Sequence, residues 1–170
     1  MLIKERYLKV KITHEFGPFF DSDSKVLILG SIPSPKSREQ GFYYGHPRNR
    51  FWPVMASLFG DDIPETVPDR KEFLKHHNIA LWDVLASCEI RGAEDSSIRE
   101  PVANDMDIIL KNSDIKAIFT TGGKASELYR KLCLPECGIK AVSLPSTSPA
   151  NCRFSMERLR KEYGIILKYL

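Results

Sequence analysis

Four short apolar runs constrain the fold of this chain more than any other feature. They are KVLILG (25–30), NIALW (78–82), IKAIF (115–119) and KAVSLP (140–145). Runs of this length, rich in β-branched residues and separated by helical patterns, are typical of parallel strands that are buried on both faces. Right-handed crossovers between such strands place helices on both faces of the sheet. The sequence therefore predicts a three-layer α/β/α sandwich with a central, mostly parallel four-stranded sheet.

Apolar residues at helical spacing predict five helices, over 48–60, 69–77, 104–111, 124–132 and 154–163. Asn49 stands where the capping residue of the first helix is expected, and Pro53 falls within the first turn. The 170 residues contain no repeat, no low-complexity tract and no long linker. The chain is therefore expected to form a single domain over residues 1–170.

Composition excludes several classes of protein. No apolar run approaches the ~18 residues of a membrane span, so no membrane partner is expected. The N-terminal stretch MLIKERYLKVKITHE mixes charges of both signs and lacks an apolar signal core, which favours a cytoplasmic protein. The cysteines are Cys88, Cys133, Cys137 and Cys152; they are expected to be reduced thiols because the chain lacks a signal segment, and they do not have the spacing of a zinc site. We therefore expect no metal and no cofactor.

Each apolar run leads into a polar cluster. The clusters are SIPSPKS (31–37), DVLASCEIRGAEDSS (83–97), TTGGKAS (120–126) and STSPANCR (146–153). Ligands of open parallel sheets bind in the crevice beyond the carboxyl ends of the strands. The four clusters are therefore expected to build one pocket.

Basic residues gather beside two of these clusters. Residues 36–50 hold four basic residues against one acidic residue, and residues 152–170 hold five against two. This distribution suits an anionic nucleic-acid backbone that passes over the pocket. For the second segment, an ordinary solvated helix face is an equally good interpretation.

The cluster TTGGKAS resembles the end of a phosphate-binding loop, but the first glycine of G-x-x-x-x-G-K is missing. A helix that begins after a glycine pair can still hold a phosphate, so Gly122 and Lys124 are candidate contacts to a DNA backbone. A tight turn into the helix explains the glycines equally well. There is no G-x-S-x-G motif, and Ser31 and Ser34 are therefore poor candidates for a hydrolase nucleophile.

The most distinctive segment is GSIPSPKSREQGFYYGHPRNRFW, residues 30–52. A long loop in a compact domain is usually functional. Aromatic side chains in a basic, proline-shaped loop are suited to stacking on a flat base. Phe42, Tyr43 and Tyr44 could alternatively be packing residues.

This segment resembles the first motif of the uracil-DNA glycosylase superfamily, in the form found in hypoxanthine-DNA (deoxyinosine) glycosylases. The resemblance covers residues 14–154 in the family's order; its features are VLILGSIPS, SREQGFYYGHPRNRFW, LWDVLASCEIRGAEDSSI, Asn104-Asp105 and LPSTSPAN. Mismatch-specific uracil-DNA glycosylases share the HPxNRFW core but differ elsewhere. The resemblance implies a monofunctional DNA glycosylase that hydrolyses the N-glycosidic bond of a deaminated base, with hypoxanthine as the expected base and damaged DNA as the partner. This reaction needs only a monomer.

The resemblance also implies roles for individual residues. Tyr44 occupies the position of the ring that stacks on the flipped base. Ile32 stands where most of the superfamily has an Asp or Asn that activates water, so ordinary water activation is in doubt. The catalytic asparagine of the HPxN motif is Asn49, although an asparagine before a helix is also a common cap. In Ser146–Pro149 the second motif presses on the DNA backbone, and Asn151 or Arg153 fills the gap left by the base.

Two carboxylates complete the candidate site. Asp83 follows the second strand and is expected either to orient Asn49 or to bind the base. Asp95 could serve the site or cap a turn. The candidate base-binding residues are Tyr44, Ser31, Ile32, Pro33 and Asp83. The candidate DNA contacts are Ser34, Lys36, Ser37, Gly122, Lys124, Ser146, Thr147, Ser148, Pro149, Asn151 and Arg153.

Two alternatives to the hypoxanthine enzyme stay open. One is a mismatch-type enzyme that removes uracil or thymine. The other is a non-catalytic binder of damaged DNA, because Ile32 removes the usual catalytic side chain.

Overall fold

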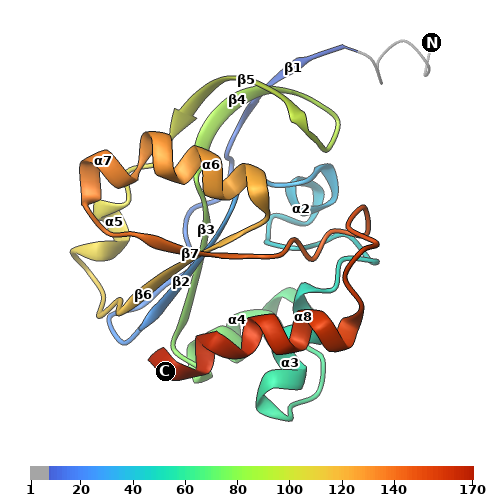
Figure 1. Cartoon of the computed structure of the whole chain (residues 1–170), viewed down its shortest axis with the longest axis vertical. Helices are drawn as coiled ribbons and strands as arrows, with labels where there is room; N and C mark the ends of the chain where they lie inside the picture. The colour runs from blue at the N-terminus through green and yellow to red at the C-terminus, as the bar shows by residue number, and fades with distance from the viewer. Residues whose placement is uncertain (1–7) are drawn as a thin grey trace.

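The structure is a computed structural model that describes residues 8–170 (Figure 1). Its central sheet has four parallel strands in the order β3-β2-β6-β7; they are β2 (Val26–Gly30), β3 (Ile79–Asp83), β6 (Ala117–Thr121) and β7 (Ala141–Leu144). Each corresponds to one of the four apolar runs. Every residue of β2, an inner strand, and of β3, an edge strand, is buried, as expected for strands of a parallel sheet that is covered on both faces. The register pairs Gly30 with Asp83, so two pocket segments begin side by side.

Helices flank this sheet. In Figure 1, α3 (Phe51–Phe59), α4 (Val67–His76) and α8 (Met156–Tyr163) lie together below it, and α6 (Gly123–Leu132) lies above it. The short helices α5 (Asp107–Leu110) and α7 (Leu134–Cys137) lie on the side of α6, and a 3-10 helix, η1 (Gly164–Tyr169), follows α8. All five predicted helices are present, although α5 is shorter than expected. The predicted α/β/α sandwich with a parallel four-stranded sheet is therefore confirmed.

The segment between Ser34 and Gly41 was expected to be loop but contains a helix, α2 (Pro35–Gln40). The Ser34 hydroxyl accepts a hydrogen bond from the Ser37 N–H, and Pro35 occupies the first helical position, where it is well tolerated. Gly41 ends the helix with a left-handed conformation (φ 70°). The prolines that suggested a loop are thus start signals of a short helix.

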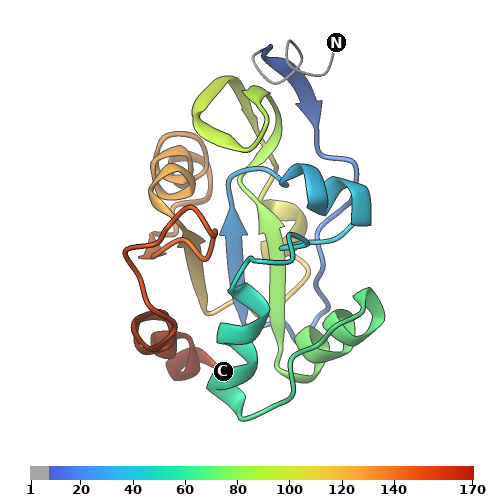
Figure 2. The ribbon, with the colours of Figure 1, turned by 90° about the vertical axis from the view of Figure 1, so that its right-hand side faces the viewer.

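A second sheet was not predicted. It is antiparallel, in the order β1-β4-β5, and consists of β1 (Val10–Thr13), β4 (Leu85–Arg91) and β5 (Glu94–Ala103). Strands β4 and β5 form a hairpin whose turn is at Gly92 and Ala93. In Figures 1 and 2 this hairpin stands beyond the carboxyl ends of the parallel strands. The polar segment after β3 is therefore a ribbon that overhangs the pocket edge of the main sheet.

No helix in the described part of the chain is long and apolar enough to cross a membrane. Within residues 8–170, no group of three or more His, Cys, Asp or Glu side chains is arranged to hold a metal ion.

Candidate active site

A pocket of about 340 Å³ opens beyond the carboxyl ends of the parallel strands. Its walls come from the loop after β2, the Tyr43–Asn49 segment, the end of β3, the tip of the β4–β5 hairpin, Thr121 at the end of β6, and the Ser146–Ala150 loop after β7. All four polar clusters of the sequence therefore contribute to one cavity. The hairpin tip supplies Ile90, Gly92, Ala93 and Asp95.

Tyr44 forms an aromatic wall of this pocket. Its ring stacks on Phe51 with centroids 3.8 Å apart and an interplanar angle of 9°. Its hydroxyl lies 3.2 Å from the Thr121 hydroxyl. Burial, and to a lesser degree the nearby Asp83 carboxylate, raises the pKa of Tyr44 well above its usual value, so the ring is neutral. Phe51 covers one face of the ring, which leaves the other face for a ligand in the pocket.

The backbone of Tyr44 is strained. Its φ of 53° places a bulky residue in the left-handed region, at a cost of about 1–2 kcal/mol. Such strain persists only where the surrounding structure enforces it. Strain of this kind clusters at functional sites. By contrast, Phe42 and Tyr43 are both 3% exposed and pack in the core, so the packing interpretation holds for these two rings.

Asn49 has an amide whose orientation is fixed by the protein. Its Oδ1 accepts hydrogen bonds from the Phe51 N–H (2.9 Å) and from the Thr147 hydroxyl (2.8 Å). Because a backbone N–H can only donate, Oδ1 must face it and Nδ2 must face the other way. None of the described residues accepts a hydrogen bond from Nδ2. Asn49 therefore caps the helix with its oxygen and keeps its NH2 group for the pocket.

Asp83 lies at the end of β3 and pairs with a residue that the sequence analysis missed. Its Oδ2 is 2.8 Å from Nε2 of His14, and both side chains are nearly buried. A Cβ on Gly30 would lie 2.5 Å from Asp83 Oδ1, so only glycine fits beside this carboxylate. The expectation that Asp83 orients Asn49 is wrong, because Phe51 and Thr147 do so. No local pattern marks His14, which is 69 residues away from Asp83 in sequence.

Asp95 lies on the overhanging hairpin, next to its turn. Its Oδ1 accepts a hydrogen bond from the Ser31 hydroxyl at 3.0 Å, which ties the hairpin to the loop after β2. Desolvation by burial raises the pKa of Asp95; the nearby Asp83 raises it further, whereas the Ser31 hydrogen bond and Lys124 lower it. The residue as a whole is exposed at the rim, but its carboxylate lies inside the pocket wall. The alternative of a turn cap is not what the structure shows.

His46 is a second pocket residue that sequence reasoning did not select. Its Nδ1 lies 3.1 Å from the Arg48 N–H and accepts a hydrogen bond from it. Its Nε2 is the ring nitrogen left for other partners. The HPxN motif could have pointed to it, since the histidine precedes Asn49 by three positions.

The second-motif loop is held in place by Arg50. The guanidinium donates hydrogen bonds to the carbonyl oxygens of Asn151 (2.8 Å) and Phe154. The Asn151 amide donates to the Ser146 carbonyl at 2.9 Å, so this side chain is occupied within its own loop. Arg153 is exposed. Of the two residues expected to fill the gap left by a flipped base, Arg153 is thus the one that is free to move into it.

The other candidate contacts fall into two groups. Ser31, Ile32, Pro33, Ser34, Ser37 and Ser146–Pro149 line the pocket. Two of these, Ser37 and Thr147, are only 2% exposed and bond to protein atoms instead of facing a DNA surface. Lys36, Gly122, Lys124, Asn151 and Arg153 lie outside the pocket lining. Position 122 requires glycine, because its φ is 93° and an added Cβ would lie 3.3 Å from Ser146 Cβ.

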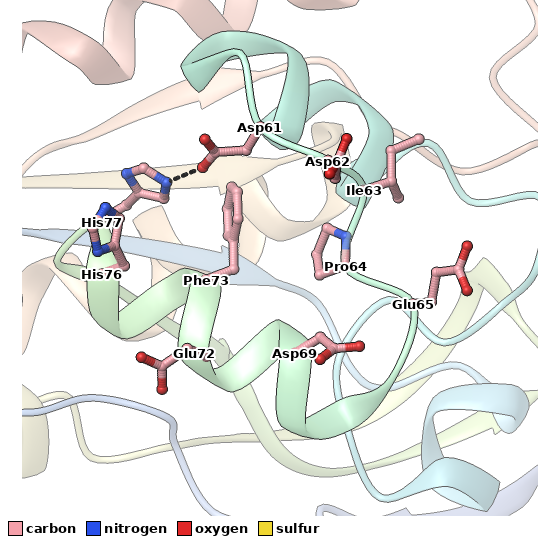
Figure 3. Close-up of a pocket in the computed structure, with 10 residues that line it drawn as sticks. All are labelled: Asp61, Asp62, Ile63, Pro64, Glu65, Asp69, Glu72, Phe73, His76 and His77. Atoms are coloured by element: carbon pink, nitrogen blue, oxygen red, sulfur yellow. Dashed lines mark hydrogen bonds and ion pairs between the residues drawn. The ribbon is translucent and has the colours of Figure 1, made fainter.

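A larger hollow, of about 890 Å³, lies between the end of α3 and α4 (Figure 3). Its carboxylates are Asp61, Asp62, Glu65, Asp69 and Glu72. His77 bonds to Asp61 at 2.6 Å and stacks on Phe59. Five acidic side chains repel a phosphate backbone, so this hollow is unsuited to DNA. The smaller pocket at the strand ends is the candidate active site.

Comparisons with known proteins show what the chain is similar to. The sequence pattern of the uracil DNA glycosylase superfamily matches residues 18–168. A hypoxanthine DNA glycosylase of Methanosarcina acetivorans is 36% identical over 149 residues, which cover 86% of this chain and 93% of that protein. A hypoxanthine DNA glycosylase of Methanosarcina barkeri is 34% identical over 139 residues, covering 81% and 87% of the two chains.

A solved structure is similar over the same extent. The solution NMR structure of a candidate uracil DNA glycosylase from Methanosarcina acetivorans has a TM-score of 0.77 and 33% identity, and the match covers 90% of this chain and 94% of that chain. The chain belongs to the uracil DNA glycosylase superfamily. Its class of activity is that of a DNA glycosylase, which hydrolyses the bond between a base and its sugar.

Proposed function

We propose that this chain removes hypoxanthine from DNA and leaves an abasic site. The observation that carries the proposal is the combination of a stacking ring, Tyr44, with a donor and an acceptor in one pocket, Asn49 Nδ2 and Asp83 Oδ1. The two relatives that carry the name hypoxanthine DNA glycosylase support the same substrate.

A base in duplex DNA reaches this pocket only after it is flipped out of the helix. Flipping costs a few kcal/mol of lost pairing and stacking, and the cost is lowest for a mismatched base. The free face of Tyr44 offsets part of it, because stacking on an aromatic ring contributes about 1–3 kcal/mol per base. Deamination of adenine leaves hypoxanthine mismatched with thymine, so the flipping step itself favours the deaminated position.

The donor and acceptor of the pocket match the edge of hypoxanthine. Hypoxanthine presents an N1–H donor and an O6 acceptor, whereas adenine presents an N1 acceptor and an N6 donor. Asp83 Oδ1 forms no hydrogen bond with a described residue and can accept the N1–H. Adenine would place its N1 lone pair against this carboxylate. Asp83 therefore selects hypoxanthine against adenine.

Asn49 acts as a donor in this scheme. Its Oδ1 is occupied by Phe51 and Thr147, so it is not free to take a proton from water. Negative charge grows on the base as the N-glycosidic bond breaks. A fixed NH2 group aimed at O6 stabilises that charge, with the backbone N–H groups of the Ser31–Ser34 loop as further donors. The positive charge on the sugar is stabilised by the flanking phosphates of the DNA.

The remaining candidate residues, which are half-buried or exposed, suit contacts to the DNA backbone. Ser146, Ser148 and Pro149 form the rim of the pocket, and Arg153 follows in the same loop. Lys36 and the Gly122–Lys124 turn lie outside the pocket and extend this surface. We also propose that residues 1–170 act as a single domain and as a monomer, since one copy supplies every group named above. We propose a cytoplasmic location because the N-terminal stretch lacks an apolar signal core.

A second candidate substrate is uracil. Its N3–H and O4 repeat the donor and acceptor order of hypoxanthine, so Asp83 and Asn49 could bind either base. The pocket gives no reason to exclude uracil on hydrogen bonding alone. The two substrates are therefore compared in the same assay.

The test is strand cleavage by hot alkali after incubation with labelled duplexes that contain hypoxanthine, uracil or no lesion. Wild type is compared with Asn49→Ala and Asn49→Asp. We expect cleavage at hypoxanthine by wild type and at least a 100-fold loss in both variants. Cleavage at uracil alone would overturn the substrate. Binding of the lesion without cleavage by wild type would favour the non-catalytic alternative.

A further inference from the structure

Asp95 is the carboxylate of the pocket to which the proposed function gives no role. It comes from the β4–β5 hairpin, an element that is not part of the parallel sheet, and reaches the same cavity as Tyr44 and Asn49. Its Oδ1 is fixed by the Ser31 hydroxyl at 3.0 Å. Its Oδ2 forms no hydrogen bond with any of residues 8–170, so it is the atom available to a bound base.

The two carboxylates of the pocket have different surroundings. Asp83 accepts a hydrogen bond from the His14 ring, whose side chain is 3% exposed. Asp95 accepts one from a neutral hydroxyl and has no basic residue within ion-pair distance among the described residues. In sites with two carboxyl groups, different surroundings commonly make one group a hydrogen-bond acceptor and the other a proton donor.

A purine is a poor leaving group when it departs as an anion. In hypoxanthine the ring nitrogen N7 keeps a lone pair while N9 carries the sugar. Protonation of N7 lets the base leave in neutral form, just as a carboxylic acid protonates the leaving group in glycoside hydrolysis. Asparagine, serine and threonine side chains cannot supply that proton, so the candidates among the lining residues are Asp83, Asp95 and His46. Asp83 is already paired with His14, and His46 is held only through Nδ1, whereas the Ser31 hydroxyl fixes Asp95 against the loop after β2.

We propose that Asp95 is the general acid that gives its proton to N7 of the flipped hypoxanthine as the C1′–N9 bond breaks. The electron pair of that bond goes to N9, and the base leaves as neutral hypoxanthine. Water adds its hydroxyl to C1′, and the proton that it releases restores the acid form of Asp95. This inference rests on the proposed function and names the catalytic residue that makes the site suited to a purine.

The charges around Asp95 favour this role. Burial and Asp83 raise the pKa of its carboxyl, while the Ser31 hydrogen bond and Lys124 of α6 lower it. The thiol of Cys88, on β4, has a pKa raised to about 11 by burial and by Asp95, so it stays neutral. Tyr43 and Tyr44 are also neutral, because burial raises the pKa of each. The other titratable groups nearby are His46 of the pocket and Arg91 and Glu94 of the same hairpin.

Asp95→Asn is the main test variant. An asparagine keeps an oxygen for the Ser31 hydroxyl but has no proton to give. Loss of a general acid reduces the rate by about 100-fold or more, so we expect that loss in single-turnover excision of hypoxanthine, with affinity for the duplex within about 3-fold of wild type. The wild-type rate should fall as pH rises through the pKa of Asp95, and the variant should lack this fall. Glu94→Gln, one position away, is the matched control and should match wild type.

A duplex that contains 7-deazahypoxanthine separates proton transfer from a structural effect. This base has a carbon at position 7 and cannot be protonated there. We expect wild type and Asp95→Asn to act on it at the same low rate. The inference is wrong if Asp95→Asn excises hypoxanthine as fast as wild type. It is also wrong if the variant loses as much on the 7-deaza base as on hypoxanthine, or if wild type excises both bases equally fast.

The two proposals fail in different ways. If wild type releases hypoxanthine and Asp95→Asn is unaffected, only the role of Asp95 is overturned. If wild type releases no hypoxanthine, the proposed function is overturned and the role of Asp95 falls with it.

Discussion

The amide of Asn49 is oriented by two protein donors, the Phe51 N–H and the Thr147 hydroxyl. Substitutions can separate the two roles of Asn49, as the helix cap and as the NH2 donor. Asn49→Asp keeps an oxygen for both bonds but lacks the NH2 group, whereas Asn49→Ala loses the oxygen and the NH2 group together. We expect Asn49→Ala to lower the free energy of unfolding by about 1 kcal/mol and Asn49→Asp to lower it by less. Urea unfolding measures both.

Excision should fall by a similar factor in the two Asn49 variants, because neither has the donor. A fully active Asn49→Asp protein would show that the NH2 group has no part in the reaction and that Asn49 serves only as a cap.

The free face of Tyr44 leads to a second prediction at this scale. Tyr44→Phe keeps the ring and loses only the contact with Thr121, so excision should stay within a few-fold of wild type. Tyr44→Ala removes the stacking surface, which contributes about 1–3 kcal/mol, and should weaken binding of the lesion duplex by roughly 5- to 150-fold. Binding of undamaged duplex, measured by fluorescence anisotropy, should be unchanged. Equal losses on damaged and undamaged DNA would count against stacking.

Some residues of the site could be predicted from the sequence and others could not. Tyr44 and Asn49 lie in a distinctive motif, and both line the pocket. His14 was not found, because its partner Asp83 is 69 positions away and only the fold brings them together. The orientation of the Asn49 amide also depends on a distant residue, Thr147, and no local pattern contains it.

Among the elements, the turn between β6 and α6 is constrained both by its backbone conformation and by a neighbouring loop. Gly122→Ala places a side chain at a φ of 93° and 3.3 Å from Ser146 Cβ, which is in the second-motif loop. We expect a loss of about 1–2 kcal/mol in the free energy of unfolding and weaker DNA binding, because the loop must shift. Thermal or urea unfolding and anisotropy measure these effects.

Gly123→Ala is the matched control. An added Cβ there has no atom within 4 Å, and its φ is not in the left-handed region. Since alanine favours helices, this variant should be as stable as wild type or slightly more stable. If both variants behaved alike, the turn geometry would not be the reason for Gly122.

Elements were predictable where one physical signal dominated. The four parallel strands are buried on both faces, so each reads as a continuous apolar run. The β4–β5 hairpin has one exposed face and irregular register, with shifts at three points along the ladder. Apolar and polar residues therefore alternate only weakly along the hairpin, and its sequence resembles that of a polar loop. Helix α2 was not predicted for a related reason, because the prolines around Ser34 are compatible both with a loop and with the first turn of a helix.

Across the whole molecule, acidic and basic side chains gather in different places. The acidic hollow beside α4 lies away from the pocket, and exposed basic groups such as Arg153 lie beside it. We expect Arg153→Ala to weaken duplex binding and to reduce the slope of log affinity against log salt by about 1. Lys116→Ala is the control, because Lys116 precedes β6 and lies at the amino edge of the sheet. Equal effects of the two substitutions would mean that the second-motif loop does not contact DNA.

The most direct test of the account identifies the released product. Wild-type protein is incubated with a duplex that contains a single hypoxanthine, and mass spectrometry quantifies free bases while a reactive probe counts abasic sites. The account predicts free hypoxanthine in a one-to-one ratio with abasic sites and no release of adenine from a matched duplex. Release of no base, or of normal purines at the same rate, would contradict it.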